Sequence, residues 1–155
     1  MTIRFAQQRD VPGLIELLQQ VGQVHHEIRP DIFRAGAQKY DAAALQQILS
    51  DSQRPIFVAV EEDFVLGYCF CVHKETLDNP VLSDATELYI DDLCVRQDCR
   101  GKGVAGGLFE YVKDYAKSSG CQNITLNVWC GNAPAEHFYE KMGMTKRNVT
   151  MELPL

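Results

Sequence analysis

The sequence predicts an α/β fold, a mixed central sheet with helices on both faces, in a single domain of residues 1–155. Segments with strand patterns alternate along the chain with segments whose apolar residues have helical spacing. Between residues 87 and 129 a strand, a glycine-rich turn, a helix and a second strand follow one another, as in a right-handed βαβ unit. A length of 155 residues suits one domain with one substantial core.

The chain begins with a strand and an amphipathic helix. Residues 3–5 alternate as a short strand, and residues 11–21 place apolar side chains at helical spacing behind Asp10, the expected N-cap. Gly22 is expected to end this helix. Residues 24–27, which include two adjacent histidines, then form a linker or a second short helix.

A second helix and a hairpin follow. Alanines and straight-chain residues favour a helix over residues 42–49, with Asp41 as its N-cap. Residues 55–60 and 65–72 are rich in β-branched and aromatic side chains, which predicts two antiparallel strands joined by the acidic turn 61–63.

The second half contains the βαβ unit. A polar loop is expected over residues 73–85, followed by a strand that ends before the glycine-rich turn. A helix then runs from about Gly103 to Ser118, Gly120 stops it, and residues 123–129 alternate as the next strand.

The last elements predicted are a helix and a strand. Asn132 is expected to cap a helix that Gly143 closes. Residues 144–153 are expected to form a final strand of the sheet.

The glycine-rich turn predicts a phosphate-binding site. Four glycines and two basic residues make up this turn: Arg100, Gly101, Lys102, Gly103, Gly106 and Gly107. Glycines let the backbone curl tightly and approach a ligand closely, because they have no Cβ. The free N–H groups and positive dipole of the following helix favour a phosphate group. The turn is therefore interpreted as a pyrophosphate cradle.

A dinucleotide-binding protein is one alternative, since Gly101, Gly103 and Gly106 satisfy the pattern G-x-G-x-x-G after a strand. That motif also needs an acidic residue at the end of the next strand to bind the ribose hydroxyls. The sequence has no acid between Ser118 and Glu136, and the turn lies too late in the chain for a doubly wound sheet. The dinucleotide alternative is therefore disfavoured.

The same turn resembles motif A of the GCN5-related N-acetyltransferases (GNAT), Q/R-x-x-G-x-G/A, through Arg100, Gly103 and Ala105. A second segment, from Asn132 to Gly143, resembles motif B, an Asn-capped helix that ends F-Y-x-x-x-G. The two matches come in the order of that superfamily. The resemblance implies the GNAT acyl-CoA N-acyltransferase fold, in which two parallel strands splay apart and acetyl-CoA lies in the gap.

The resemblance also implies a set of residues that bind acetyl-CoA as cosubstrate. They are exposed strand backbone, the turn and the motif B helix: Leu93, Cys94, Val95, Arg100, Gly101, Lys102, Gly103, Val104, Ala105, Gly106, Asn132 and Tyr139.

The implied reaction is direct transfer of the acetyl group to an amine, with no covalent intermediate on Cys94 or Cys99. Tyr139 resembles the superfamily tyrosine that gives a proton to the departing thiolate. The carboxylates available as a general base are Asp91 and Asp92 at the strand end and Glu87 earlier in the strand, with a water chain as the alternative. Asp91 matches in position a glutamate of diamine acetyltransferases. In a regular strand Asp91 and Asp92 face opposite sides, so only one can reach a given amine unless a bulge intervenes.

The acceptor is expected to be a small-molecule, polyamine-like or peptide amine. In the acetyltransferase layout Ile32, Phe33 and Tyr40 are candidate pocket residues, with the apolar core as their alternative role. A second class of function stays open: an acyl-CoA-binding or sensor module without turnover. The resemblance also leaves a homodimer open.

Composition limits the classes of binding partner that are expected. A net charge of −6 argues against nucleic acid, which needs a concentrated basic face, and suits cationic small molecules. The N-terminal residues lack a signal-like apolar region and no apolar run is long enough for a membrane span, so a cytoplasmic protein without a membrane partner is expected. The six cysteines show no C-x-x-C pair; most are expected to be buried apolar residues, and no metal site is predicted.

Overall fold

The computed structural model describes residues 1–155 and contains one five-stranded sheet and four α-helices. In chain order the elements are β1 (Thr2–Phe5), a 3-10 turn (Gln8–Asp10), α1 (Val11–Ile28), α2 (Ala42–Leu49), β2 (Ile56–Glu61), β3 (Phe64–Thr76), β4 (Ala85–Val95), a 3-10 turn (Gln97–Cys99), α3 (Val104–Ser118), β5 (Asn123–Leu126) and α4 (Ala133–Lys141). The strands are ordered β1-β2-β3-β4-β5. Only the β4–β5 pair is parallel, so the sheet is mixed as predicted.

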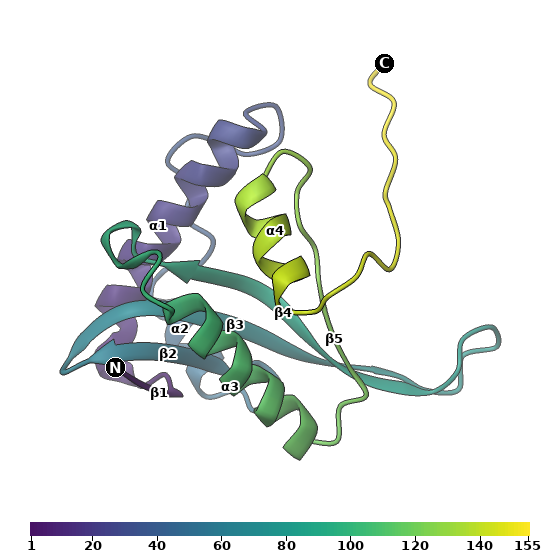
Figure 1. Ribbon diagram of the computed structural model, residues 1–155, viewed down its shortest axis with the longest axis horizontal. Helices are drawn as coiled ribbons and strands as arrows, with labels where there is room; N and C mark the ends of the chain where they lie inside the picture. Colours follow the sequence, from purple (N-terminus) through teal and green to yellow (C-terminus); the bar gives the residue numbers. More distant parts are fainter.

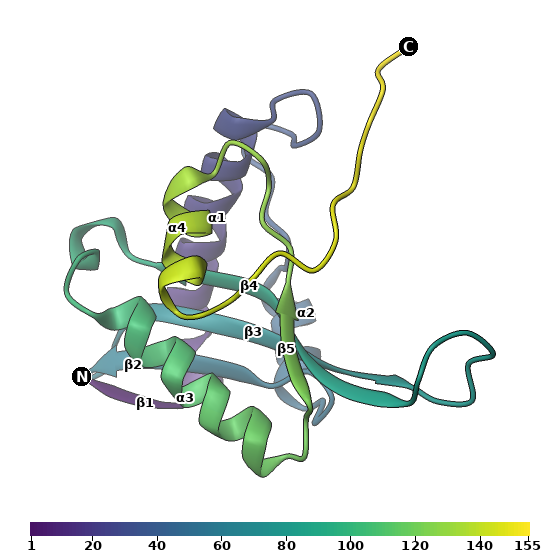
Figure 2. The ribbon, with the colours of Figure 1, turned by 45° about the vertical axis from the view of Figure 1, so that its right-hand side comes forward.

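Helices cover both faces of this sheet (Figures 1 and 2). One core lies under α1 and α2 and includes Leu14, Leu45, Val58 and Tyr68. The other lies under α3, with α4 against its edge, and includes Phe57, Leu88, Leu108 and Val112. Strand alternation explains the division, because neighbouring residues such as Phe57 and Val58 point to opposite faces.

Helix α1 is longer than the sequence suggested. Gly22 does not end it, and the predicted linker that contains His25 and His26 is its last turns. A Cβ on Gly22 would collide with the carbonyl oxygen of Ala37, so this glycine allows the loop before α2 to approach the helix. Although α1 has 18 residues, none of the helices is long and apolar enough to cross a membrane.

Two of the three predicted N-caps, Asp41 and Asp10, behave differently. Asp41 caps α2, since its Oδ1 accepts a hydrogen bond from the Ala44 amide at 2.8 Å. Asp10 makes no cap bond to α1. Its buried carboxylate instead accepts hydrogen bonds from Arg4 at 2.7 and 2.9 Å and from the Gln7 amide at 2.7 Å, which pins β1 to the start of α1.

Several boundaries in the second half differ from the prediction. The hairpin of β3 and β4 extends into the expected loop 73–85, so that only residues 77–84 lie outside the strands. Strand β5 ends at Leu126 rather than at 129. The predicted final strand is wrong: residues 144–155 have no regular secondary structure and run away from the sheet (Figure 2).

Candidate active site

The glycine-rich turn lies between β4 and α3 and leads directly into the helix. Gly101 and Gly103 have φ angles of 75° and 81°, a region that side chains with a Cβ adopt only with strain. Nothing lies within 4 Å of the position of a Cβ on either residue, or on Gly106, so the space beside the backbone at these residues is open. The turn thus presents bare backbone.

Backbone donors line this turn. The Gly107 amide bonds to the Gly103 oxygen at 2.9 Å, which leaves the first amides of α3 without helical partners. The side chain of Val104 is buried in the core, so this residue offers only its amide to a ligand. Arg100 and Lys102 are exposed on either side of Gly101. Free amides, a helix N-terminus and two cations fit a pyrophosphate group.

The sheet opens next to the turn. Pairing between β4 and β5 ends where Ile90 lies opposite Leu126, whereas β4 continues to Val95. Leu93, Cys94 and Val95 are paired with β3 on one side only. Beyond Ile90 no strand pairs with this edge of β4, although the Val95 carbonyl oxygen accepts a hydrogen bond from the Gln20 side chain at 3.0 Å. An unpaired strand edge suits an amide-containing chain such as pantetheine.

A β-bulge places two carboxylates on the same face. Phe70 lies opposite Asp92 and Cys71 lies opposite Ile90, so Asp91 is the extra residue in β4. Both aspartates consequently point to the side of α1 and α2, where Asp91 contacts Tyr40 and Asp92 contacts Tyr68. The β-bulge that the sequence analysis allowed as an alternative to a regular strand is present.

Asp92 is the more enclosed of the two carboxylates. Tyr68 donates a hydrogen bond of 2.7 Å to its Oδ2. Burial raises the pKa of Asp92, and the hydrogen bond from Tyr68 and the charges of Lys39 and His25 only partly oppose this effect. No ion pair neutralises this carboxylate, so its proton affinity is that of a base stronger than an ordinary aspartate.

Asp91 is already engaged. Its Oδ2 accepts hydrogen bonds from Lys39 Nζ at 2.7 Å and from the Tyr40 hydroxyl at 3.1 Å. Burial alone would lower the pKa of Lys39, but the bond to Asp91 raises it. Glu87, a carboxylate earlier in β4, bonds instead to Arg147 at 2.9 Å and to Thr125 at 3.3 Å, outside this cluster.

Tyr139 lies on α4 and belongs in part to the core. Its ring contacts Phe138 and Phe109, with centroid distances of 5.1 and 6.2 Å. Burial raises the pKa of its hydroxyl, and the charges of Cys69 and Asp92 add to this effect, so the phenol stays protonated. The side-chain oxygen of Asn132 caps α4 by accepting from the Ala135 amide at 3.3 Å.

The cysteines at the end of β4 do not form a nucleophilic site. Cys94 lies against α1, and burial raises the pKa of its thiol to about 12. Four of the six cysteines are buried, in line with the expected apolar role. No group of three or more histidine, cysteine, aspartate or glutamate side chains lies close enough to hold a metal ion.

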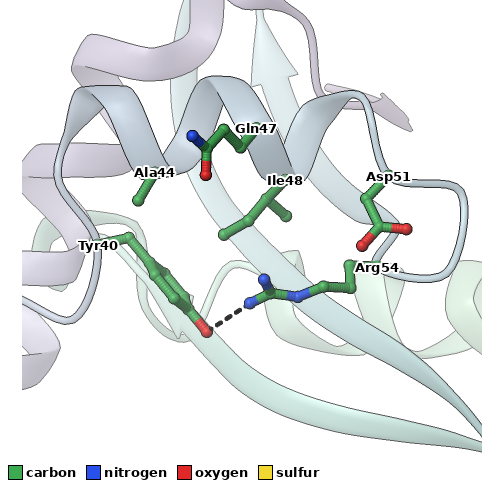
Figure 3. Close-up of a pocket in the computed structure, with 6 residues that line it drawn as sticks. All are labelled: Tyr40, Ala44, Gln47, Ile48, Asp51 and Arg54. Atoms are coloured by element: carbon green, nitrogen blue, oxygen red, sulfur yellow. Dashed lines mark hydrogen bonds between the residues drawn. The ribbon is translucent and has the colours of Figure 1, made fainter.

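A pocket of about 230 Å³ lies between α2 and Tyr40 (Figure 3). Its wall consists of Tyr40, Ala44, Gln47, Ile48, Asp51 and Arg54. Tyr40 connects the pocket to the site: its hydroxyl accepts a hydrogen bond from Arg54 Nη2 at 2.9 Å and donates one to Asp91. The predicted pocket residue Tyr40 therefore lies beside the carboxylates.

The other two predicted pocket residues, Ile32 and Phe33, do not line this pocket. Ile32 is 45% exposed on the loop after α1. Phe33 lies between His25 on α1 and Trp129 in the segment after β5, with ring-centroid distances of 5.0 and 5.1 Å.

Sequence reasoning missed Lys39, Arg54 and Tyr68. Lys39 and Asp91 are 52 positions apart, and nothing in either segment indicates the pairing. Tyr68 occurs in a continuous apolar strand, where a polar hydroxyl among buried residues was the one available signal.

Comparison with known proteins identifies relatives. The model of the acetyltransferase (GNAT) family matches residues 22–144. N-alpha-acetyltransferase 30 of Schizosaccharomyces pombe is 31% identical over 93 residues, which are 58% of this chain and 57% of that protein. The chain spans about half or less of the length of the curated relatives that it matches.

Solved structures agree with the fold. A mutant of the BH1408 protein from Bacillus halodurans has a TM-score of 0.95 and 31% identity, with 100% of this chain and 99% of that chain covered. The aminoglycoside N-acetyltransferase AAC(6')-Iy in complex with CoA has a TM-score of 0.73, with 99% and 98% covered, but only 15% identity. The second likeness concerns the fold alone.

Proposed function

Because the chain belongs to the acetyltransferase (GNAT) family, we propose that it transfers an acetyl group from acetyl-CoA directly to an amine. The observation that carries this proposal is a single strand, β4, which joins three parts of a site. Its bulge presents two carboxylates, its free edge suits a pantetheine chain, and its end leads into the cradle. The cytoplasmic location stays a prediction.

The residues proposed to hold acetyl-CoA are those that the sequence suggested. The amides of the turn and of Val104, Ala105 and Gly106 face the pyrophosphate, with Arg100 and Lys102 as countercharges. The β4 edge at residues 93–95 takes the pantetheine amides, and Asn132 and Tyr139 bound the site from α4. When bound, acetyl-CoA supplies an activated acyl group as a thioester.

The chain's residues then move two protons. Asp92 is proposed to accept a proton from the acceptor's ammonium group, so that the neutral amine can attack the thioester carbonyl. A C–N bond forms and the C–S bond breaks; the nitrogen releases its second proton to solvent, and Tyr139 gives its proton to the departing thiolate and is reprotonated from solvent. Asp91 holds the positive charge of the acceptor before this transfer.

We propose a cationic primary amine as the acceptor, either a small molecule of polyamine type or a peptide amine. Two carboxylates and the tyrosines Tyr40 and Tyr68 surround the place where the nitrogen would lie, a combination that favours ammonium groups. The pocket beside Tyr40 is the proposed place for the rest of the acceptor, where Asp51 and Arg54 offer charges of both signs.

A ligand-binding experiment tests the cosubstrate. We expect CoA and acetyl-CoA to raise the melting temperature of the wild type, and NAD to leave it unchanged. Gly103→Val should weaken CoA binding, because a β-branched residue resists φ = 81° and its side chain projects into the cradle. Affinity would be measured by isothermal titration calorimetry.

Gly120→Val is the matched control. Gly120 has φ = 76° and equally clear surroundings, but it lies at the other end of α3. Similar destabilisation of both variants with loss of CoA binding only in Gly103→Val supports the cradle. Stabilisation by NAD without a response to CoA would reject the assignment, and CoA binding without release of free thiol from acetyl-CoA over an amine panel would indicate a binding module.

Lys39 tests the acceptor site. Its ammonium group forms an ion pair with Asp91, as the ammonium group of a cationic acceptor would. The lysine side chain is 45% exposed and the aspartate side chain 20% exposed. Lys39→Ala should therefore lower the KM for a diamine by about two- to fivefold, the range expected for a partly exposed ion pair. Lys117→Ala, which removes an exposed lysine on α3, should change nothing. A higher KM in Lys39→Ala would show that Lys39 helps to bind the acceptor.

A further inference from the structure

Three polar side chains meet on the α3 side of the sheet, away from the proposed acetyltransferase site. His73 on β3 places its Nδ1 3.7 Å from the Sγ of Cys121 and its Nε2 2.9 Å from the hydroxyl oxygen of Tyr115. Tyr115 belongs to α3, and Cys121 lies in the link from α3 to β5, at the opposite end of the helix from the cradle (Figure 2). Because α3 has 15 residues, its two ends are roughly 22 Å apart. The proposed acetyl transfer uses none of these three residues.

The arrangement lets His73 act as a base for the thiol. When Nε2–H donates to the Tyr115 hydroxyl, Nδ1 has a free lone pair that faces the Sγ of Cys121. A nucleophile, a base within its reach and a third group that orients the base are the usual signs of an activated side chain. Burial raises the pKa of the Cys121 thiol, so this thiol depends on a base to react near neutral pH.

Backbone hydrogen bonds fix the segment that carries the thiol. The Cys121 amide donates to the Ala116 oxygen at 2.9 Å, and the Gln122 amide donates to the Thr86 oxygen at 2.8 Å. Cys121 is half-buried, whereas four of the other cysteines are buried and Cys130 is exposed. Cys121 thus combines a fixed position with access from outside.

Cys121 lines a pocket of about 260 Å³ between α3, β5 and the end of α4. The wall includes Lys113 and Lys117 but no acidic residue, and Phe109 and Met142 add apolar surface. Each lysine pairs with a carboxylate one turn earlier on α3. Such exposed pairs are weak, so an incoming anion can replace the carboxylate. The pocket therefore suits a small molecule that has negative charge and apolar atoms.

We propose that Cys121 is a modification site, at which the thiol, with His73 as its base, exchanges with small anionic disulfides that enter this pocket. The thiol proton moves to Nδ1 of His73, and the thiolate attacks one sulfur of the disulfide. A bond forms between Sγ and that sulfur, the S–S bond of the disulfide breaks, and the departing thiolate takes the proton from His73. The sulfur of Cys121 is oxidised and the departing sulfur is reduced, so the disulfide itself is the oxidant. Lys113 and Lys117 attract its negative charges.

Two variants of the full chain compare Cys121 with the exposed Cys130. Oxidised glutathione, an anionic disulfide, is added at pH 7 to Cys130→Ser and to Cys121→Ser, and the intact mass is followed with time. After subtraction of the rate of the double variant, the adduct should form about tenfold faster in Cys130→Ser, because a thiol without a base is only a few per cent ionised at this pH. Exposure alone predicts the opposite order. An equal or lower rate in Cys130→Ser overturns the proposal.

Histidine variants in the Cys130→Ser chain test the base. His73→Gln should slow formation of the adduct about tenfold. His26→Gln is the matched control, since His26 also has a partner, the Phe33 oxygen at 2.7 Å, but lies on α1. Tyr115→Phe is the milder variant, because it removes only the hydroxyl that orients the ring, and should slow the reaction about two- to tenfold, the value of one hydrogen bond. Melting temperatures show which variants are folded. Unchanged rates in folded His73→Gln or in Tyr115→Phe reject His73 as the base.

The charge of the disulfide tests the pocket. With cystamine, a cationic disulfide, the ratio of the Cys121 rate to the Cys130 rate should be about fivefold smaller than with oxidised glutathione, because the two lysines attract one reagent and repel the other. Lys113→Gln combined with Lys117→Gln should remove this difference between the reagents. Equal ratios for the two disulfides in the chain that keeps both lysines would show that the pocket does not select anions, and would overturn this part of the proposal.

Discussion

Asp92→Asn is expected to lower kcat/KM for a cationic amine by about 10²- to 10⁴-fold, the usual contribution of a general base. Asp92 is the one carboxylate of the pair that is not ion-paired, and burial raises its pKa. Asparagine fills nearly the same volume and its oxygen can still accept the hydrogen bond from Tyr68. The measurement is steady-state CoA release as a function of amine concentration.

The pH profile gives a second readout for Asp92. A base must be deprotonated, so the rate of the wild type should fall as the pH drops through the pKa of Asp92, which lies above the ordinary value near 4. This acid limb should be absent in the variant. The melting temperature at neutral pH should be equal or higher, because a raised folded-state pKa means that the charged form costs stability at high pH.

Asp91→Asn is the matched control for Asp92→Asn. Asp91 is proposed to hold the acceptor's charge, so its replacement should raise the KM for a diamine more than it lowers kcat. If Asp91→Asn abolishes turnover while Asp92→Asn retains it, the roles of the two carboxylates are reversed. If neither variant changes kcat, water carries the proton and the carboxylates only bind.

Tyr139→Phe should lower kcat on the order of 10²-fold, with the melting temperature and the affinity for acetyl-CoA little changed. The variant removes only the hydroxyl, while the ring keeps its contacts with Phe109 and Phe138. We expect the low end of the range for a general acid, because a thiol with a pKa near 8.5 leaves tolerably well as thiolate. CoA release at saturating acetyl-CoA measures the effect.

Tyr111→Phe provides the comparison for Tyr139→Phe. Tyr111 lies on α3, is 37% exposed, and also packs by its ring, against Phe57. Its hydroxyl is not part of the proposed site, so kcat should be unchanged. Equal kcat values for the wild type and both variants would return Tyr139 to the role of a core aromatic.

The glycine turn could be predicted from sequence because its requirement is local. Positive φ angles and an absent Cβ are properties of Gly101 and Gly103 themselves, whatever the rest of the chain does. The helix caps show the limit of such reasoning. Asp41 bonds to the next turn as expected, whereas Asp10 finds Arg4, a better partner supplied by the preceding strand.

Other features depend on contacts between distant segments. Gly22 is of the residue type that commonly ends a helix, but here a glycine is needed because the Ala37 backbone approaches the helix closely. The ion pair of Lys39 and Asp91 depends on how the loop before α2 folds over β4. The segment 144–155 has a correct strand pattern and no strand partner in its own chain, so the period of two predicts its conformation but not its pairing.

The bulge at Asp91 also shifts the alternation of side chains along β4 by one residue. Before it, the even-numbered Leu88 and Ile90 belong to the core under α3, and after it the odd-numbered Val95 does, while Cys94 belongs to the core under α1. Even-numbered residues thus face the core under α3 before the bulge, and odd-numbered residues face it after the bulge; the two halves of the strand alternate in opposite frames. Loss of Asp91 alone would bring the two halves into one frame and leave Ile90, Asp92 and Val95 on their present sides of the sheet, so this deletion would remove one of the two carboxylates without turning the rest of the strand over.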